Sequence, residues 1–215
     1  MRRADGKPAK PRGRPRSFDR EAALERAIDV FWRHGYEATS VSDLTSAMGI
    51  NPPSLYAAFG DKEKLFLEAV ERYQQQRRQA VMKVFDEAPS AKEAVHRVLQ
   101  EAARELACSS HPRGCLLVMS DTNCSDASAH VQSDLAQRRS AMKASVKARI
   151  DRGAAAGELP RGTDTAALAE FYSTVFQGMV MQARDGATPR RLLATAETAM
   201  RAWPKAAAKG SPHWK

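Results

Sequence analysis

The sequence predicts an all-α fold, with a three-helix unit at the N-terminus and a larger helical domain after it. Three observations support this prediction. Apolar residues recur at helical spacing along most of the chain, as at Leu24, Ala27, Ile28 and Phe31. Residues that cap or end helices separate these stretches. Alternation of apolar and polar residues, the pattern of a half-buried strand, does not rise above noise.

The first predicted helix begins after Asp19, a good N-cap residue, and runs to about His34. Gly35 ends it, because glycine adopts the left-handed backbone of a helix C-terminus at little cost. A second, short helix begins after Ser40, whose side chain can form a capping box with Asp43. In a three-helix unit of this kind the first helix covers the other two.

The next residues are typical of a tight turn and a third helix. Gly49 suits the turn, and Asn51 can cap the new helix with Pro52 at its first position, where the missing N–H costs nothing. Leu55 and Phe59 are four residues apart, so they share the face that packs on the second helix. The opposite face is small and mostly uncharged, which suits a DNA major groove.

These residues resemble the DNA-binding domain of the TetR/AcrR transcriptional regulators, in one register over roughly residues 18–73. The chain departs from the family pattern at Pro52 and Pro53, where many members carry Lys-Gly, and at Ala57 and Ala58, where many carry His or Tyr. The bases that it contacts therefore stay open. The resemblance is carried by Ala27, Phe31, Gly35, Tyr36, Thr39, Ser40, Val41, Asp43, Leu44, Met48, Gly49, Ile50, Ser54, Leu55, Tyr56, Phe59, Lys62, Leu65 and Phe66.

The resemblance implies a ligand-responsive regulator, most often a repressor. Such a protein binds a palindromic double-stranded DNA operator as a homodimer and is released by a small-molecule inducer. Tyr56 is expected to offer its hydroxyl to a phosphate, and Lys62 to bring its ammonium to one at the N-terminal end of the next helix. The expected DNA-binding residues of this domain are Thr39, Ser40, Ser42, Asn51, Pro52, Pro53, Ser54, Tyr56, Ala57 and Lys62.

Residues 1–17 form a basic arm with seven basic residues against one acidic residue, a net charge of +6. We expect it to be disordered when free, since it has few apolar residues to fold around. Its centre resembles an AT-hook, in which Arg12, Arg14 and Arg16 would lie in an A·T-rich minor groove. The alternative is an arm that adds only unspecific attraction to phosphates.

The chain has 215 residues and a formal net charge of +9, which favours an anionic partner. No run of 18 apolar residues could span a bilayer, and the charged, proline-rich N-terminus is not a secretory signal. Three cysteines, an odd number, argue against a disulfide framework. We therefore expect a cytoplasmic protein with no membrane partner.

The expected domains are a helix-turn-helix DNA-binding domain at 18–62 and a helical regulatory and dimerisation domain at 63–204, followed by a frayed tail at 205–215. The short apolar run Cys115–Met119 is assigned to helix from its surroundings and from the resemblance. The other helices of this domain are expected at 62 to about 85, 90 to about 107, 126 to about 155, 164 to about 184 and 188 to about 203.

No residues suggest catalysis, a cofactor or a metal site. The chain lacks a Gly-rich phosphate loop and a His-Glu-x-x-His pair, and its five histidines are scattered. Two alternatives to a ligand-responsive regulator remain. One is an architectural DNA-binding protein without a ligand, and the other, more remote, is a helical enzyme that has kept a vestigial DNA-binding domain.

Apolar residues in the C-terminal domain could line a ligand pocket, form the core or form a dimer interface, since one helix has two faces. The resemblance favours a pocket. Its candidate residues are Met82, Phe85, Leu116, Met119, Met142, Phe171, Val175, Phe176 and Met179. The candidate residues of the dimer interface are Phe171, Val175, Met179, Leu192, Leu193 and Met200.

The three cysteines, Cys108, Cys115 and Cys124, lie close together in the sequence. Such thiols could sense redox state, electrophiles or a soft metal, if Arg113 or His111 lowered their pKa. The alternative is that Cys115 is a small core residue and the other two are incidental, which is the commoner situation for buried cysteines.

Overall fold

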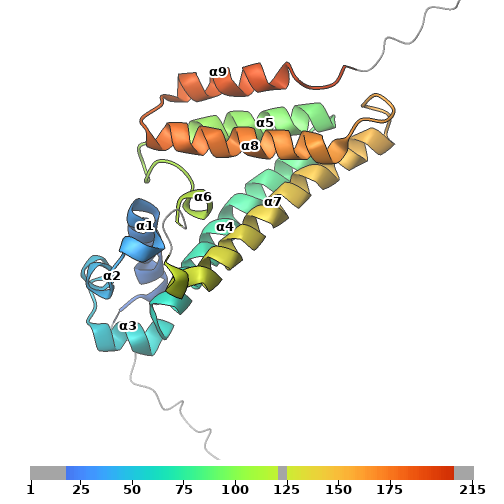
Figure 1. The fold of residues 1–215 in the computed structure, drawn as a ribbon. Helices are drawn as coiled ribbons and strands as arrows, with labels where there is room; N and C mark the ends of the chain where they lie inside the picture. The colour runs from blue at the N-terminus through green and yellow to red at the C-terminus, as the bar shows by residue number, and fades with distance from the viewer. Residues whose placement is uncertain (1–17, 121–124, 206–215) are drawn as a thin grey trace, which may run out of the picture.

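The computed structural model describes residues 18–120 and 125–205, and within these ranges the chain is helical and contains no strand (Figure 1). The predicted all-α fold is confirmed. The helices are α1 (Arg20–Ala38), α2 (Val41–Met48), α3 (Pro52–Phe59), α4 (Lys62–Glu87), α5 (Ala91–Glu105), α6 (Leu116–Met119), α7 (Ala129–Ala155), α8 (Thr165–Arg184) and α9 (Pro189–Met200), with a 3₁₀ turn at Asp126–Ser128.

The helices form two parts, which we call the head (α1, α2 and α3) and the body (α4 to α9) (Figure 1). The long helices α4 and α7 run side by side away from the head. At the other end of the molecule α5 packs against α9, and α8 packs against α7. Because α4 begins at the head and ends in the body, it connects the two parts mechanically.

Most of the helix starts that the sequence predicts are confirmed; the helix expected from 126 begins instead at Ala129, after the 3₁₀ turn. Ser40 and Asp43 form the full capping box of α2. The predicted caps Asp19 and Asn51 accept hydrogen bonds from the first turn of their helices, and Asp61 and Asp164 do the same at the starts of α4 and α8. Capping satisfies N–H groups that have no partner inside the helix, which is why these local patterns are dependable.

Gly35 does not end α1 but bends it. Its φ of 76° and ψ of 177° interrupt the helical backbone, and one further turn follows to Ala38. A Cβ at this position would lie 3.5 Å from the carbonyl oxygen of Ser120, which follows α6. The backbone N–H of Tyr36 donates to that same carbonyl over 3.2 Å. The bend in α1 is therefore a contact point between the head and the body.

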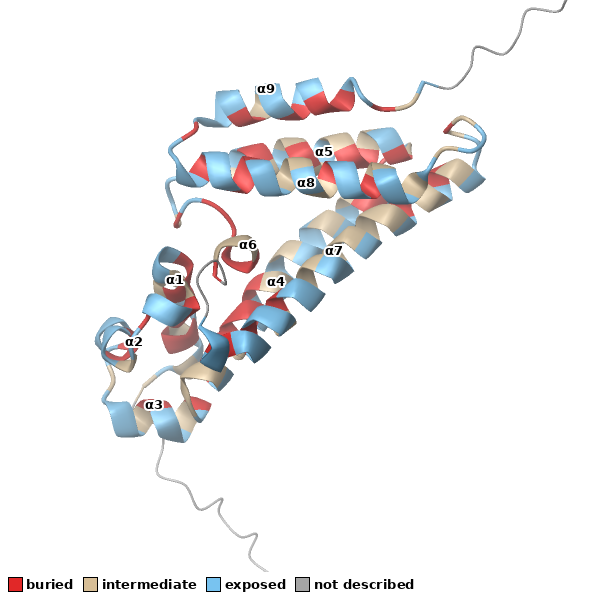
Figure 2. Ribbon diagram, viewed as in Figure 1, coloured by how far each residue is buried: buried red, intermediate tan, exposed pale blue. Residues whose placement is uncertain are grey.

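One hydrophobic core continues from the head into the body, with the buried faces of the helices turned towards each other (Figure 2). Phe31 of α1 meets Phe66 of α4 edge to face, with ring centroids 5.0 Å apart. A smaller cluster of Phe85, Ala88 and Ala94 lies where α4 meets α5. The first turns of α4 are thus part of the core that holds the head together.

The C-terminal end of α4 is held by two arginines of α7. The buried guanidinium of Arg149 donates to the carbonyl oxygens of Phe85 over 3.0 Å and Ala88 over 3.2 Å. Arg152 donates to the carbonyl of Phe85 as well, over 3.2 Å. Positively charged groups at a helix C-terminus donate hydrogen bonds to its free carbonyls and interact favourably with the helix dipole. This end of α4 is consequently fixed to α7.

Candidate nucleic-acid interface

The helices α2 and α3 are joined by a tight turn and held by buried side chains. Leu44 and Leu55 are fully buried, and Met48 and Phe59 are nearly so. Gly49 has a φ of 68° and a ψ of 34°, the left-handed conformation that the turn requires. The result is a helix-turn-helix whose second helix, α3, lies at the end of the molecule away from α9 (Figure 1).

The outer face of α3 consists of Pro52, Pro53, Tyr56 and Ala57. These residues are spaced i, i+1, i+4 and i+5, so they share one side of the helix, and all four are exposed. Tyr56 has an exposed fraction of 49 %, which is unusual for a large aromatic side chain. The face of α3 that the sequence predicts to contact DNA is therefore exposed to solvent.

The predicted DNA-binding residues fall into three groups by exposure. Thr39 is buried, and Ser54 and Lys62 are partly buried. The exposed members are Ser40, Ser42, Asn51, Pro52, Pro53, Tyr56 and Ala57. All except Thr39 thus keep side-chain surface that a partner can reach.

Thr39 is a correction to the prediction. Its side chain is 1 % exposed, and its hydroxyl donates to the carbonyl oxygen of Gly35 over 2.6 Å. The side chain closes the last turn of α1 after the bend, so it is not available to DNA. The resemblance placed the residue next to the groove, but the bend at Gly35 turns it inwards.

Two of the exposed residues use their side chains as helix caps. Ser40 Oγ accepts from the N–H of Asp43 over 3.1 Å and donates to a carboxylate oxygen of Asp43 over 2.6 Å. The hydrogen bonds that the hydroxyl and the backbone N–H of Ser40 donate to the Asp43 carboxylate lower its pKa from the usual value. Asn51 Oδ1 accepts from the N–H of Ser54 over 2.9 Å. Both residues are thus partly engaged before any DNA arrives.

Lys62 lies at the start of α4 with its ammonium turned towards α1. The nitrogen is 4.4 Å from the centre of the Tyr36 ring and 3.4 Å from the carbonyl oxygen of Glu37. This cation–π contact holds the side chain at the head surface.

The folded head carries a negative formal charge. Residues 18–62 contain four basic and seven acidic residues, a net charge of −3. Several of the basic residues are engaged within the protein: Arg20 pairs with Glu68, and Arg33 pairs with Asp29 at 2.9 Å. Attraction of the head to phosphates must therefore come largely from elsewhere in the chain. The basic arm with Arg12, Arg14 and Arg16, which the sequence predicts to contact DNA, lies outside the described residues.

Comparison with known proteins shows to which family the chain belongs. Residues 23–69 match the family "Bacterial regulatory proteins, tetR family", and residues 91–203 match the family "Tetracyclin repressor-like, C-terminal domain". The chain belongs to the TetR family. The match covers the helix-turn-helix and most of the body, so both parts of the fold follow the TetR family.

Relatives of the chain in the TetR family include two repressors from Escherichia coli (strain K12). The HTH-type transcriptional repressor ComR is 36 % identical over 197 residues, which is 91 % of this chain and 94 % of ComR. The HTH-type transcriptional repressor BdcR is 33 % identical over 188 residues, 87 % of this chain and 90 % of BdcR. Both relatives are covered almost completely, so the resemblance is not confined to the DNA-binding head.

A solved structure extends the comparison. The TetR family transcriptional regulator CifR, as a cysteine mutant complexed with 26-base-pair double-strand operator DNA, has a TM-score of 0.87 and 46 % sequence identity to this chain. The match covers 89 % of this chain and 100 % of that one. The arrangement of head and body described above is therefore similar to one found in a DNA complex of this TetR-family relative.

The candidate residues of the TetR-type ligand pocket do not form one group. Phe85 packs in the small cluster at the end of α4, and Met82 is exposed. Leu116 and Met179 belong to the main core, and four more pack against it: Met119, Met142, Val175 and Phe176. Phe85 and Met82 are thus separated from the others, because the far half of α4 packs against α5 and not against α6 and α8.

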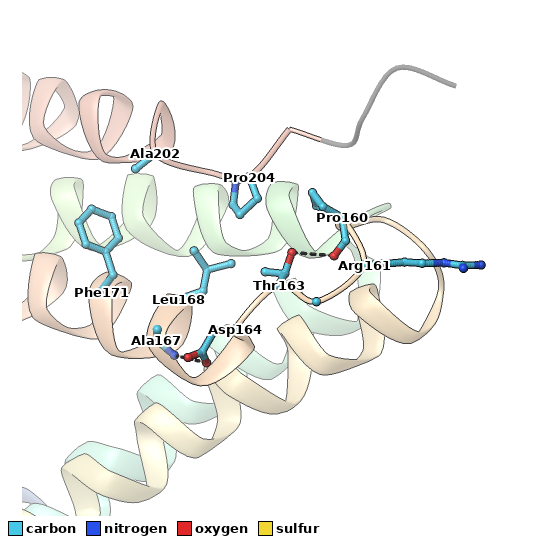
Figure 3. Close-up of a pocket in the computed structure, with 10 residues that line it drawn as sticks. Pro160, Arg161, Thr163, Asp164, Ala167, Leu168, Phe171, Ala202 and Pro204 are labelled. Atoms are coloured by element: carbon cyan, nitrogen blue, oxygen red, sulfur yellow. Dashed lines mark hydrogen bonds between the residues drawn. The ribbon is translucent and has the colours of Figure 1, made fainter. Parts of the chain in front are cut away.

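Two surface hollows lie elsewhere in the described body. An open groove of about 550 Å³ lies between the start of α8 and the end of α9 (Figure 3). Of the predicted pocket residues only Phe171 borders it, beside Leu168 and Pro204. A smaller hollow of about 250 Å³ is lined by Ser90, Lys92, Glu158, Trp203, Pro204 and Lys205. Apart from Phe171, the predicted pocket residues therefore line neither hollow.

Half of the predicted dimer residues are buried inside the chain itself. Met179, Leu192 and Met200 have exposed fractions of 1 %, 1 % and 7 %. Their apolar faces are covered by neighbouring helices of the same body, which corrects the prediction for these three. Phe171 is 41 % exposed, and Val175 and Leu193 are partly buried.

The described part of the body also carries an exposed stripe on α8. Ala167, Phe171, Thr174, Gly178 and Met181 follow one another at spacings of four, three, four and three residues, and all are exposed. This is the heptad spacing of helices that pack together. The pattern was present in the sequence, but periodicity alone could not say which apolar side of α8 the body covers.

The cysteines divide between core and surface. Cys115 is 3 % exposed, as expected of a core residue, and Cys124 lies outside the described residues. The Sγ of Cys108 lies 3.1 Å from Ser110 Oγ, and hydrogen bonds from Ser110 lower the pKa of the Cys108 thiol. The expected influence of His111 or Arg113 on this pKa is therefore replaced by that of Ser110.

The head–body junction was missed by sequence reasoning. His111, in the connection between α5 and α6, stacks on Trp32 of α1 and lies 3.0 Å from a carboxylate oxygen of Glu105. Arg77 of α4 also bonds Glu105, over 3.0 Å, and lies over the Trp32 ring. The four residues come from separate elements, so no spacing in the sequence announces them.

Proposed function

We propose that this TetR-family protein is a cytoplasmic repressor that binds a palindromic operator as a homodimer and is released by a small molecule. The observation that carries the proposal is the exposed face of α3 on a rigid helix-turn-helix. The relatives ComR and BdcR are described as repressors, and CifR was solved with operator DNA. A symmetric dimer places two copies of α3 about one turn of DNA apart, or a multiple of that distance.

The exposed stripe on α8 supports a dimer through this helix. Phe171 and Met181 are each 41 % exposed, and a Cβ added to Gly178 would meet no atom within 4 Å. A second α8 can therefore approach closely at Gly178 while Phe171 and Met181 pack beside it. Phe171→Asp should convert the dimer to a monomer in light scattering, while Met82→Asp, at an exposed site on α4, should leave it dimeric.

Operator contact is tested by two substitutions in the head. Tyr56→Phe removes one hydroxyl and Lys62→Ala one ammonium, so each should weaken operator binding through a lost phosphate contact. The lysine variant should also reduce the steepness of log affinity against log salt by about two units, one for each protomer of the dimer. Lys83→Ala, on the far half of α4, is the control. Operator affinity that stays unchanged in both head variants would contradict the proposed contacts.

Two measurements separate this proposal from the alternatives. Discrete palindromic protection in a footprint supports a regulator, whereas uniform coating of DNA supports an architectural protein. DNA binding at physiological salt would dismiss the idea of an enzyme with a vestigial head. Mass spectrometry of small molecules that remain bound through purification would identify the inducer, which must prefer one conformation of the protein over the other.

A further inference from the structure

The outer face of α3 has no side chain that can form a two-point hydrogen-bond pair with a base. Such pairs use arginine or lysine for guanine, asparagine or glutamine for adenine, and a carboxylate for cytosine. The exposed residues here are Pro52, Pro53, Tyr56 and Ala57. A recognition helix of this composition must distinguish base pairs by another route.

The nearby polar groups are one capping amide and two hydroxyls. Asn51 is the one amide at this end of α3, and its Oδ1 already accepts from the N–H of Ser54 over 2.9 Å. This capping bond holds the amide at the start of α3, so a pair with adenine would need the same oxygen to accept a second hydrogen bond without leaving the cap. The hydroxyls of Ser54 and Tyr56 each offer a single group, which fits more than one base or a phosphate. Hydrogen bonds from these residues place the helix but discriminate weakly.

The apolar groups on this face fit one feature of the major groove. Only thymine presents a methyl group there, at C5, and small apolar side chains are its usual partners. The rings of Pro52 and Pro53 and the methyl of Ala57 are exposed on a helix that Leu55 and Phe59 hold in place. Contact between two apolar groups removes both from water without desolvating a charge.

We propose that α3 selects its operator chiefly by contact of Pro52, Pro53 and Ala57 with thymine methyl groups, so that each half-site contains thymines at the positions facing these residues. The inference rests on the proposed function, since it takes α3 as the helix in the groove. The chemical group that the head recognises is then the 5-methyl group of a pyrimidine in the major groove.

Replacing thymine by deoxyuridine tests this directly, because uracil lacks the methyl group and keeps every hydrogen-bonding atom of thymine. An operator is first selected from random duplexes with the full-length chain, and each thymine is then replaced in turn. At a contacted thymine the affinity should fall by about 4-fold, which is the factor that corresponds to the free energy of burying one methyl-sized group. Replacement at the equivalent position of both half-sites should cost about 15-fold, if the two sites contribute equally.

A pair of protein variants assigns the effect to α3. Ala57→Gly removes the methyl partner, so the uracil penalty at one thymine per half-site should shrink towards 1-fold in this variant. Ala80→Gly makes the same change at an exposed site on α4, with the same helix propensity cost, and should keep the full penalty. Pro53→Ala should reduce the penalty at a neighbouring thymine.

The outcomes distinguish the inference from the function on which it rests. A discrete footprint with uracil penalties below about 1.5-fold at every thymine, well under the value for one buried methyl group, would overturn the methyl readout. The same footprint would leave the proposed operator binding intact. The methyl readout by α3 would also be overturned if the uracil penalties had the expected size but did not change in Ala57→Gly and Pro53→Ala. Absence of any discrete footprint would overturn both.

Discussion

The indole of Trp32 in α1 and the imidazole of His111 stack, with ring centroids 4.7 Å apart and planes 18° apart. Glu105 holds this contact, because its Oε1 lies 3.0 Å from both His111 Nε2 and a guanidinium nitrogen of Arg77. Arg77 itself lies over the Trp32 ring, 5.1 Å from its centre. One carboxylate of α5 thus positions two side chains of the body against one side chain of the head.

Glu105→Gln should loosen this junction. The amide keeps the shape of the side chain but removes the negative charge shared by Arg77 and His111. We expect the midpoint of thermal unfolding to fall by about 2–4 °C, because partly exposed ion pairs contribute up to about 1 kcal/mol in a chain of this size. Glu101→Gln is the matched control, since Glu101 bonds only Arg104 on the same helix and should change the midpoint by less than about 1 °C. Equal effects of the two variants would exclude the junction as a stabilising contact.

Glu37 should make a further head–body contact, to Ser125 and Ser128 just before α7, depend on pH. Hydrogen bonds from the hydroxyls of Ser125 and Ser128, at 2.7 and 2.8 Å, lower the pKa of the Glu37 carboxyl, and Lys62 adds to the effect. A carboxyl whose pKa is lower in the folded state stabilises the protein above its ordinary pKa, and this contribution is lost as the pH falls through the folded-state value.

Thermal unfolding of Glu37→Gln between pH 7 and pH 3 measures this contribution. At neutral pH the midpoint of thermal unfolding of the variant should lie below that of the wild-type protein. This difference should shrink as the pH drops below the usual pKa of a glutamate, about 4.3. A difference that is constant over the whole range would show that the carboxylate charge has no part in the contact.

Gly153 lets α7 approach the first residue of α5 closely. A Cβ at this position would lie 2.5 Å from the Cβ of Ala91 and 2.8 Å from a carboxylate oxygen of Glu158, which itself accepts from the N–H of Ala91. Gly153→Ala should therefore destabilise the fold by about 1–3 kcal/mol through overpacking. The double variant Gly153→Ala, Ala91→Gly removes the opposing methyl and should recover part of the loss. No recovery in the double variant would place the cause elsewhere.

Local signals in the sequence predicted the helices well because capping depends on neighbours only a few residues away. Ser40 with Asp43, and Asn51 before Pro52, act in the structure as their spacing indicated. Burial depends on distant elements, and there the sequence was ambiguous. Met179 and Phe171 both lie on α8 in apolar surroundings, yet one is 1 % exposed and the other 41 %, since α9 and α5 cover only one side. Thr39 is buried for a similar reason, because its exposure depends on how the chain packs after the bend at Gly35.

The basic arm should decide how strongly the head meets DNA. The folded head has a net charge of −3 and the arm +6, so removal of residues 1–17 should weaken operator binding and flatten its salt dependence. Both interpretations of the arm predict this loss. If Arg12, Arg14 and Arg16 lie in the minor groove, the loss should be larger for operators with A·T flanks, whose narrow minor groove attracts arginine. Affinities of the full-length and truncated proteins, measured at one salt concentration on operators with A·T and G·C flanks, decide between them. Equal losses on both would leave the arm as an unspecific source of positive charge.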